Sequence, residues 1–326
     1  MSKHIPTLNQ NKLIAKVRSQ FLEPQSNTDV ALYLQNISYY DLVKGYKNTP
    51  FKNINNQFIK GIDINTLYQI HWIDMSFGNL LLKFSLETEK HLKSVLSTIV
   101  TSFGNDPEHY LNERYYRNAS TKILDNVRAM IGNDLDGSFA IAKDSFGTVP
   151  AWYAINKVSF GQAINWYARL RSPSKRQIAK SLLRPPIILS NLSEQDELDM
   201  LRSFLKYILE VRNKAAHGRR ILNLNIQENI QTRWVKDAGI EDYFATNDNG
   251  QILRTIPNYL TIIMLLTDIP LFGINVLNET VTFSNTNSLP GANPFPSQLS
   301  VTNLYGISEN DIDRLKELLK MKFDPT

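Results

Sequence analysis

A helical repeat of apolar residues between Ser193 and Arg212 constrains the fold of this chain more than any other feature. The apolar positions recur at three- and four-residue spacing, which places them on one face of an α-helix: Leu198, Leu201, Leu205 and Ile208. Ser193 can cap this helix together with Asp196, and the acidic residues of the first turn complement the helix dipole. Arg212 continues the apolar face, so we expect its side chain to lie toward the protein interior or toward a partner.

Helical periodicity dominates the rest of the chain as well, and the sequence shows neither βαβ alternation nor an internal repeat. We expect breaks near Gly78 and Gly161 and a final helix capped by Ser308. Three further helical stretches are predicted: residues 64–100, 118–130 and 151–170. The predicted fold class is therefore all-α, a helical bundle with additional N- and C-terminal helical segments.

Length and composition exclude several classes of protein. A chain of 326 residues with 42% apolar content can form one large or two modest domains. The absence of cysteine excludes disulfide scaffolds and cysteine nucleophiles and indicates a reducing compartment. The N-terminus lacks a signal-peptide core, and the apolar stretch 259–266 fits a buried helix but not a membrane span, so we expect a cytoplasmic protein. Residues 280–296 have the composition of a surface loop. No metal-ligand spacing and no glycine-rich phosphate loop are present, so we expect neither a metal nor a cofactor.

Positive charge is concentrated in one part of the chain, although the net charge is only +5. No acidic residue lies between Asp144 and Glu194. The candidates for contact with a polyanion in this interval are Arg169, Arg171, Lys175, Arg176 and Lys180. The alternative is that these residues lie on a helix face exposed to solvent and contact no polyanion.

Residues 110–118 interleave tyrosine with Arg114 and Arg117, a pattern suited to stacking on unpaired RNA bases. By contrast, we expect three other aromatic residues in the core: Tyr40, Trp152 and Phe160.

The candidate reactive centre follows the apolar repeat directly. Arg212 can bind a phosphate oxygen, His217 can exchange protons near neutral pH, and Asn213 can orient the imidazole or the substrate. Lys214, Arg219 and Arg220 supply further positive charge. Such a set suits attack by a ribose 2′-hydroxyl on the adjacent phosphate, which cleaves RNA and not DNA. The alternative is that Arg212 and His217 only cap a helix and pair with acidic neighbours.

The spacing of the pair adds a geometric condition. Five residues turn a helix through about 500°, so the two side chains diverge by about 140° on a straight helix. Convergence on one phosphate requires the helix to end near Gly218, or two copies of the motif to meet across an interface. We expect both.

Four blocks in order resemble those of a known family. The run RNKAAH at residues 212–217 resembles the Arg-polar-x-x-x-His signature of HEPN ribonucleases. The segment 37–46 is similar to the NYYRLxGY block of bacterial abortive-infection proteins of the AbiD and AbiF type, with Asp41 and Val43 as departures. Residues 89–93 resemble the IExxLK helix of that family, and residues 149–161 resemble its P-x-W-x(6)-SFG block. The region after residue 227 matches no block.

The resemblance implies an all-helical HEPN fold and a metal-independent endoribonuclease that acts as a homodimeric toxin in phage defence. It also implies a cognate small noncoding RNA as a regulatory partner. Carried over by position, Arg212 and His217 are the catalytic pair and Asn213 is the polar residue. We expect an N-terminal segment over residues 1–60, a HEPN-like core over 61–225 and a C-terminal extension over 226–326. Two alternatives remain: a weakly catalytic or non-catalytic protein that binds a structured RNA, and a toxin whose motif is modified or blocked by a partner protein.

Overall fold

The computed structural model describes residues 9–46, 49, 51–117, 121–183, 192–286 and 300–323. Within these ranges the chain forms α-helices and short 3-10 turns, with isolated β-bridges and no β-strand. The predicted all-α class is therefore confirmed. None of the helices in these ranges is both long enough and apolar enough to cross a membrane.

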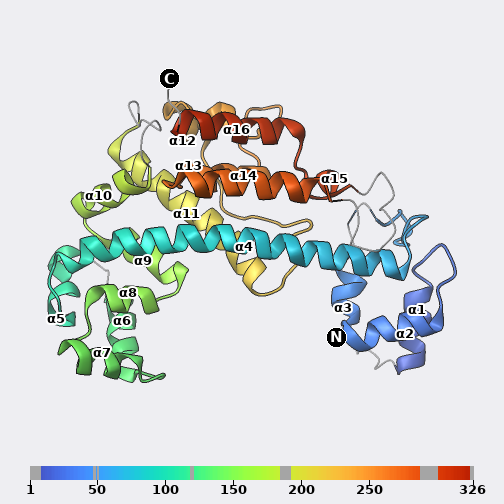
Figure 1. Cartoon of the computed structure of the whole chain (residues 1–326), viewed down its shortest axis with the longest axis horizontal. Helices are drawn as coiled ribbons and strands as arrows, with labels where there is room; N and C mark the ends of the chain where they lie inside the picture. Colours follow the sequence, from blue (N-terminus) through green and yellow to red (C-terminus); the bar gives the residue numbers. More distant parts are fainter. Residues whose placement is uncertain are drawn as a thin grey trace, which may run out of the picture.

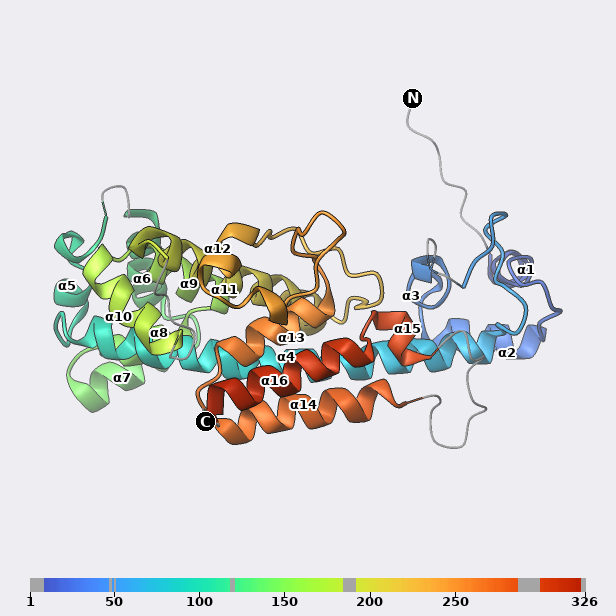
Figure 2. The ribbon, with the colours of Figure 1, turned by 90° about the horizontal axis from the view of Figure 1, so that it is seen from above.

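One long helix, α4 (Ile64–Thr101), runs through the whole molecule, and the other helices pack around it (Figures 1 and 2). Asp63 caps its start by accepting a hydrogen bond from the backbone N–H of Thr66 at 2.7 Å. The predicted break at Gly78 is wrong, because α4 is continuous there. A side chain at Gly78 would lie 3.4 Å from Ile221, so this glycine provides room for a segment that packs against α4.

Three short helices lie at the N-terminal end of α4 (Figure 1): α1 (Gln10–Arg18), α2 (Asn27–Asn36) and α3 (Tyr39–Leu42). Ser38 caps α3 by accepting a hydrogen bond from the backbone N–H of Asp41 at 3.1 Å. The chain then turns through η1 (Lys44–Tyr46), in which Tyr46 is fully buried. Tyr40 is 63% exposed, so the prediction that it anchors the core is wrong.

The opposite end of α4 carries six helices (Figure 1): α5 (Pro107–Tyr110), α6 (Thr121–Asn133), α7 (Ser138–Phe146), α8 (Ala151–Lys157), α9 (Phe160–Arg169) and α10 (Ser172–Leu182). The break predicted near Gly161 falls at Ser159, because Ser159 and Gln162 form a capping box that starts α9. Phe160 is buried as expected, but Trp152 is 40% exposed and is not a core anchor.

The remaining helices cover one side of α4 (Figures 1 and 2): α11 (Glu194–Ala216), α12 (Thr232–Asp237), α13 (Ile256–Leu265), α14 (Pro270–Ser284), α15 (Val301–Tyr305) and α16 (Glu309–Phe323). α13 is buried along its whole length, as predicted for residues 259–266. Ser308 and Asp311 cap α16 as expected. The loop predicted over 280–296 is wrong for residues 280–284, which complete α14, and residues 287–296 lie outside the described ranges.

Candidate functional site

The end of α11 has the geometry that its sequence predicts. Ser193 begins the helix by accepting a hydrogen bond from the backbone N–H of Asp196 at 3.1 Å, and the helix ends at Ala216. His217 occupies the capping position, and Gly218 follows with a φ of +60°, a left-handed conformation that favours glycine. As a result, the imidazole of His217 lies exposed at the helix terminus.

Arg212 faces inward, toward α4. Its Nη2 atom lies 3.4 Å from Oε2 of Glu89, a carboxylate that is 7% exposed. The second oxygen of that carboxylate lies 2.8 Å from Nζ of Lys93, one helical turn away. Nη1 of Arg212 donates a 3.4 Å hydrogen bond to Oδ1 of Asn213, whereas its buried Nε has no hydrogen-bond partner among the described residues. The guanidinium is therefore held in place while part of its donor capacity remains unused.

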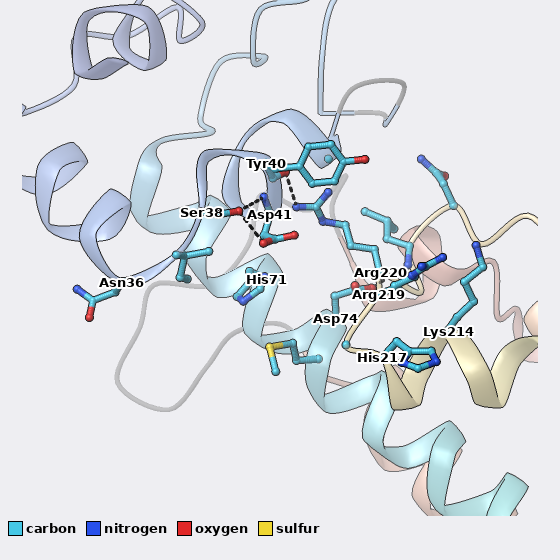
Figure 3. A pocket seen from close by; sticks show the side chains of 16 residues that line it. Asn36, Ser38, Tyr40, Asp41, His71, Asp74, Lys214, His217, Arg219 and Arg220 are labelled. Carbon is cyan, nitrogen blue, oxygen red and sulfur yellow. Dashed lines mark hydrogen bonds between the residues drawn. The ribbon is translucent and has the colours of Figure 1, made fainter. Parts of the chain in front are cut away.

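His217 lines a cavity of about 1070 Å³ beside the end of α11 (Figure 3). One wall comes from residues 36–45, between the end of α2 and η1, and a second wall comes from α4 through His71, Asp74 and Met75. The third wall is the end of α11 with the following segment, residues 214–223. Three stretches that are far apart in sequence thus surround one mostly polar space.

Asp74 fixes the segment that follows α11. Its buried carboxylate accepts hydrogen bonds from the backbone N–H groups of Ile221 at 3.1 Å and Leu222 at 2.7 Å. The hydroxyl of Tyr305 donates a third bond at 2.9 Å. Burial raises the pKa of Asp74, while the three donors act in the opposite direction. These bonds determine where the chain turns after His217.

Arg220 connects that segment to the N-terminal helices. Its guanidinium lies over the ring of Tyr46, 4.1 Å from the ring centroid, and Nη2 donates a 3.5 Å hydrogen bond to the backbone oxygen of Tyr40. A Cβ atom on Gly45 would lie 0.9 Å from Nη1 of Arg220, so only glycine leaves room for this side chain. Burial and the nearby positive charge of Arg220 lower the pKa of His71. Arg220 therefore connects two walls of the cavity, and its predicted phosphate contact stays a prediction.

The two members of the predicted pair lie on different faces of α11 within one chain. His217 lines the cavity, whereas Arg212 does not and instead faces Glu89. Asn213 and Lys214 share a smaller neighbouring cavity of about 460 Å³ with His217. The structure therefore brings Asn213 and Lys214 close to His217, and it separates Arg212 from the space that His217 lines.

The basic interval contributes fewer exposed charges than its sequence suggests. Arg169, Arg171 and Lys180 are exposed. Lys175 is only 5% exposed, and burial together with the charge of Arg117 lowers its pKa to about 8. Arg176 pairs with Glu194 at the start of α11 at 2.5 Å. The prediction of a phosphate contact is corrected for Lys175, because this side chain is enclosed in the protein.

Two of the three tyrosines of residues 110–118 are buried, and the third, Tyr115, is partly buried. Tyr110 and Tyr116 are buried and form hydrogen bonds through their hydroxyls, to the backbone oxygen of Val149 at 3.1 Å and to that of Tyr110 at 2.7 Å, respectively. Tyr115 stacks on Phe103, with 4.1 Å between ring centroids. The predicted platform for RNA bases is therefore wrong for these tyrosines, which stabilise the fold. Arg114 lies over the ring of Tyr115, Arg117 donates to Ser172 at 3.1 Å, and Asn118 lies outside the described residues.

Sequence reasoning missed several residues of the site. Glu89, Gly45 and Tyr46 lie inside the blocks that carry the family resemblance, and that signal could have marked them as partners of the motif. His71 and Asp74 have no such signal, because they lie within the ordinary helical pattern of α4. Among the described residues no group of three or more histidine, aspartate or glutamate side chains is placed to hold a metal ion.

Comparison with known proteins gives one match. Residues 32–223, more than half of the chain, match a family model described as Abi-like protein. The matched range begins in α2 and ends just after the segment that Asp74 fixes, so it contains all three walls of the cavity and the Arg212–Glu89 pair. Searches among curated proteins and among solved structures gave no match.

Proposed function

The chain belongs to the Abi-like protein family, which supports a role in abortive infection, a form of defence against phage; on this premise we propose that it is an RNA-cutting toxin. The activity is metal-independent endoribonuclease cleavage, with Arg212 and His217 as the catalytic pair and Asn213 as an orienting residue. The observation that carries the proposal is the placement of His217, an exposed imidazole at a helix end beside a polar cavity with basic residues.

The proposed reaction needs no group beyond the substrate and these side chains. The ribose 2′-oxygen attacks the adjacent phosphorus, its proton passes to a base, and the bond from phosphorus to the 5′-oxygen breaks. The leaving oxygen takes up a proton, so the products are a 2′,3′-cyclic phosphate and a 5′-hydroxyl. His217 transfers protons in this scheme, because imidazole exchanges protons near neutral pH. Arg212 stabilises the negative charge that develops on the phosphate oxygens.

The position of Arg212 supports a two-fold arrangement. Within one chain Arg212 faces α4 and His217 faces the cavity, so a single phosphate does not meet both. In a homodimer whose α11 ends adjoin, His217 of one subunit and Arg212 of its partner contact the same phosphate. Such an isologous contact creates two equivalent sites.

A small noncoding RNA is the proposed regulatory partner. The exposed cations are Arg169 at the end of α9, Arg171 just before α10 and Lys180 on α10. They lie in the part of the chain that adjoins the start of α11, where Arg176 pairs with Glu194. His217 lies at the other end of the same helix. Two separate basic regions suit one RNA that binds the protein stably and another that is cut.

One observation favours the alternative of an RNA-binding protein without cleavage. The guanidinium of Arg212 is already paired with Glu89, which reduces the charge that it can offer to a phosphate. In this alternative the motif holds a structured RNA, and the pair only stabilises the junction of α4 and α11.

The test is incubation of labelled RNA with the protein in EDTA, after co-purified RNA has been removed. The proposed function predicts fragments that end in a 2′,3′-cyclic phosphate, with DNA of the same sequence left intact. Absence of cleavage across all tested RNAs supports the binding alternative, and cleavage only with added Mg²⁺ contradicts the proposed chemistry.

A further inference from the structure

We propose that the cavity beside His217 binds one unpaired nucleotide of the RNA substrate, with Tyr40 stacking on its base and Lys214 and Arg219 contacting its phosphates. This inference rests on the proposed function and specifies how the same site holds its substrate. Three observations carry it: an exposed aromatic side chain, unneutralised cations, and their placement around one space.

The first observation is the ring of Tyr40. It lines the cavity and is 63% exposed, whereas the neighbouring Tyr39 packs against the core. Nζ of Lys44 lies over this ring, 5.5 Å from its centroid, and the backbone oxygen of Tyr40 accepts the hydrogen bond from Arg220. An exposed aromatic ring on a fixed backbone, with a cation at one face, can stack its other face on an unpaired base.

The second observation is the charge of the cavity. Lys214, Arg219 and Arg220 line it together with two carboxylates. Asp74 is saturated by three hydrogen bonds from within the protein. Asp41 accepts a 2.6 Å hydrogen bond from the hydroxyl of Ser38 at the start of α3. Neither Lys214 nor Arg219 forms an ion pair with another described residue, so their positive charge is available for phosphate groups.

The third observation is the placement of these groups. Tyr40 belongs to the wall formed by α3, and His217 and Lys214 belong to the wall formed by the end of α11 (Figure 3). The volume of about 1070 Å³ slightly exceeds that of most pockets that hold small ligands, roughly 300–1,000 Å³, so a nucleotide fits within it. Asp41, the residue after Tyr40, offers a carboxylate to the edge of a base stacked on Tyr40. A nucleotide seated there directs its phosphate toward His217.

The experiment measures binding separately from cleavage. A fluorescent single-stranded RNA with 2′-fluoro sugars cannot be cut by its own 2′-oxygen, and its affinity for the full chain is read by anisotropy. We expect Tyr40→Ala to weaken binding about fivefold or more, the lower range of a lost base stack, and Tyr40→Phe to bind as the parent does. Leu32→Ala is the matched control, because Leu32 is 54% exposed on α2 and does not line the cavity.

The outcomes are distinguishable from those of the cleavage test. If Tyr40→Ala binds the RNA as tightly as the parent, the nucleotide site is refuted. It is also refuted if Leu32→Ala loses as much RNA affinity as Tyr40→Ala does. A nucleoside monophosphate that binds in a Tyr40-dependent way and is not displaced by the RNA assigns the cavity to a free nucleotide and overturns the RNA assignment. A protein that cuts no RNA in EDTA but binds it through Tyr40 refutes the proposed cleavage and leaves the nucleotide site standing.

Discussion

Arg212 of α11 and Glu89 of α4 form an ion pair in which Nη2 and Oε2 are 3.4 Å apart. The pair joins two segments that are 123 positions apart in the sequence and that both resemble family blocks. It explains why an arginine can continue an apolar helix face, because a largely buried carboxylate compensates its charge. It also restricts the position of the guanidinium.

Glu89→Gln removes the negative charge that holds Arg212 and Lys93. We expect the free energy of unfolding to fall by about 1–3 kcal/mol, less than for a fully buried pair because Arg212 is partly exposed. RNA cleavage should fall with it, because the guanidinium loses its fixed position. Urea denaturation measures the first effect, with Glu87→Gln as the control. Glu87 forms an exposed pair with Lys90, so its loss should cost less than about 1 kcal/mol. Equal stability of the two variants would show that the Arg212–Glu89 pair stabilises nothing.

Lys175→Met should make the protein more stable at pH 7. Burial and the charge of Arg117 lower the pKa of Lys175 to about 8 in the folded protein, against 10.5 ordinarily. Between these values the unfolded chain binds more protons, so the destabilisation caused by this lysine is full below about pH 8 and disappears as pH rises toward 10.5. We expect a gain of about 1–2 kcal/mol for the variant at pH 7, narrowing as pH rises from 8 toward 10. Denaturation of both proteins between pH 6 and 10 measures the gap. A gap that stays constant with pH would contradict the assigned pKa.

The elements that the sequence predicts well are those that local chemistry determines. The start of α11 depends on Ser193 and Asp196, and its end depends on Gly218, so both could be placed from neighbouring residues alone. Gly78 shows the opposite case. Glycine weakens an isolated helix, but here it accommodates Ile221, a residue distant in sequence, and the helix continues.

The candidate site could be predicted only in part, because most of its contacts join residues that are distant in sequence. His217 could be singled out from its neighbours, but the cavity beside it is built from three distant segments, and the sequence contains no signal for His71 or Asp74. Whether a large aromatic side chain is buried also depends on tertiary packing, which neighbouring residues do not determine. Tyr116 is buried although arginines flank it, and Tyr40 is exposed although it lies in a family block.

Replacement of the exposed cations on α9 and α10 should reduce the salt dependence of RNA binding. For Arg169→Gln, Arg171→Gln and Lys180→Gln combined, the slope of log K against log salt should decrease by about 0.7 for each lost contact with single-stranded RNA. Lys175→Met is the matched control, since its buried charge should leave the slope as in the parent. An unchanged slope in the triple variant would identify this region as a solvated face without RNA contacts.

Mixing two inactive variants tests the proposed dimer. If one phosphate meets Arg212 of one subunit and His217 of the other, a mixed dimer of Arg212→Ala and His217→Ala subunits retains one intact site. With random exchange, half of the dimers are mixed, and cleavage should recover to about a quarter of the parent rate. No recovery after verified subunit exchange would show that the two residues do not act across an interface.

The role of His217 is tested by RNA cleavage in EDTA, with His217→Ala compared with His109→Ala. His109 is also an exposed histidine at a helix end, but it pairs with Asp106 on the short helix α5, away from the cavity. If His217 transfers protons in the reaction, His217→Ala should lose cleavage and toxicity while it retains co-purified RNA, and His109→Ala should behave as the parent. Undiminished cleavage by His217→Ala would show that this histidine is not catalytic.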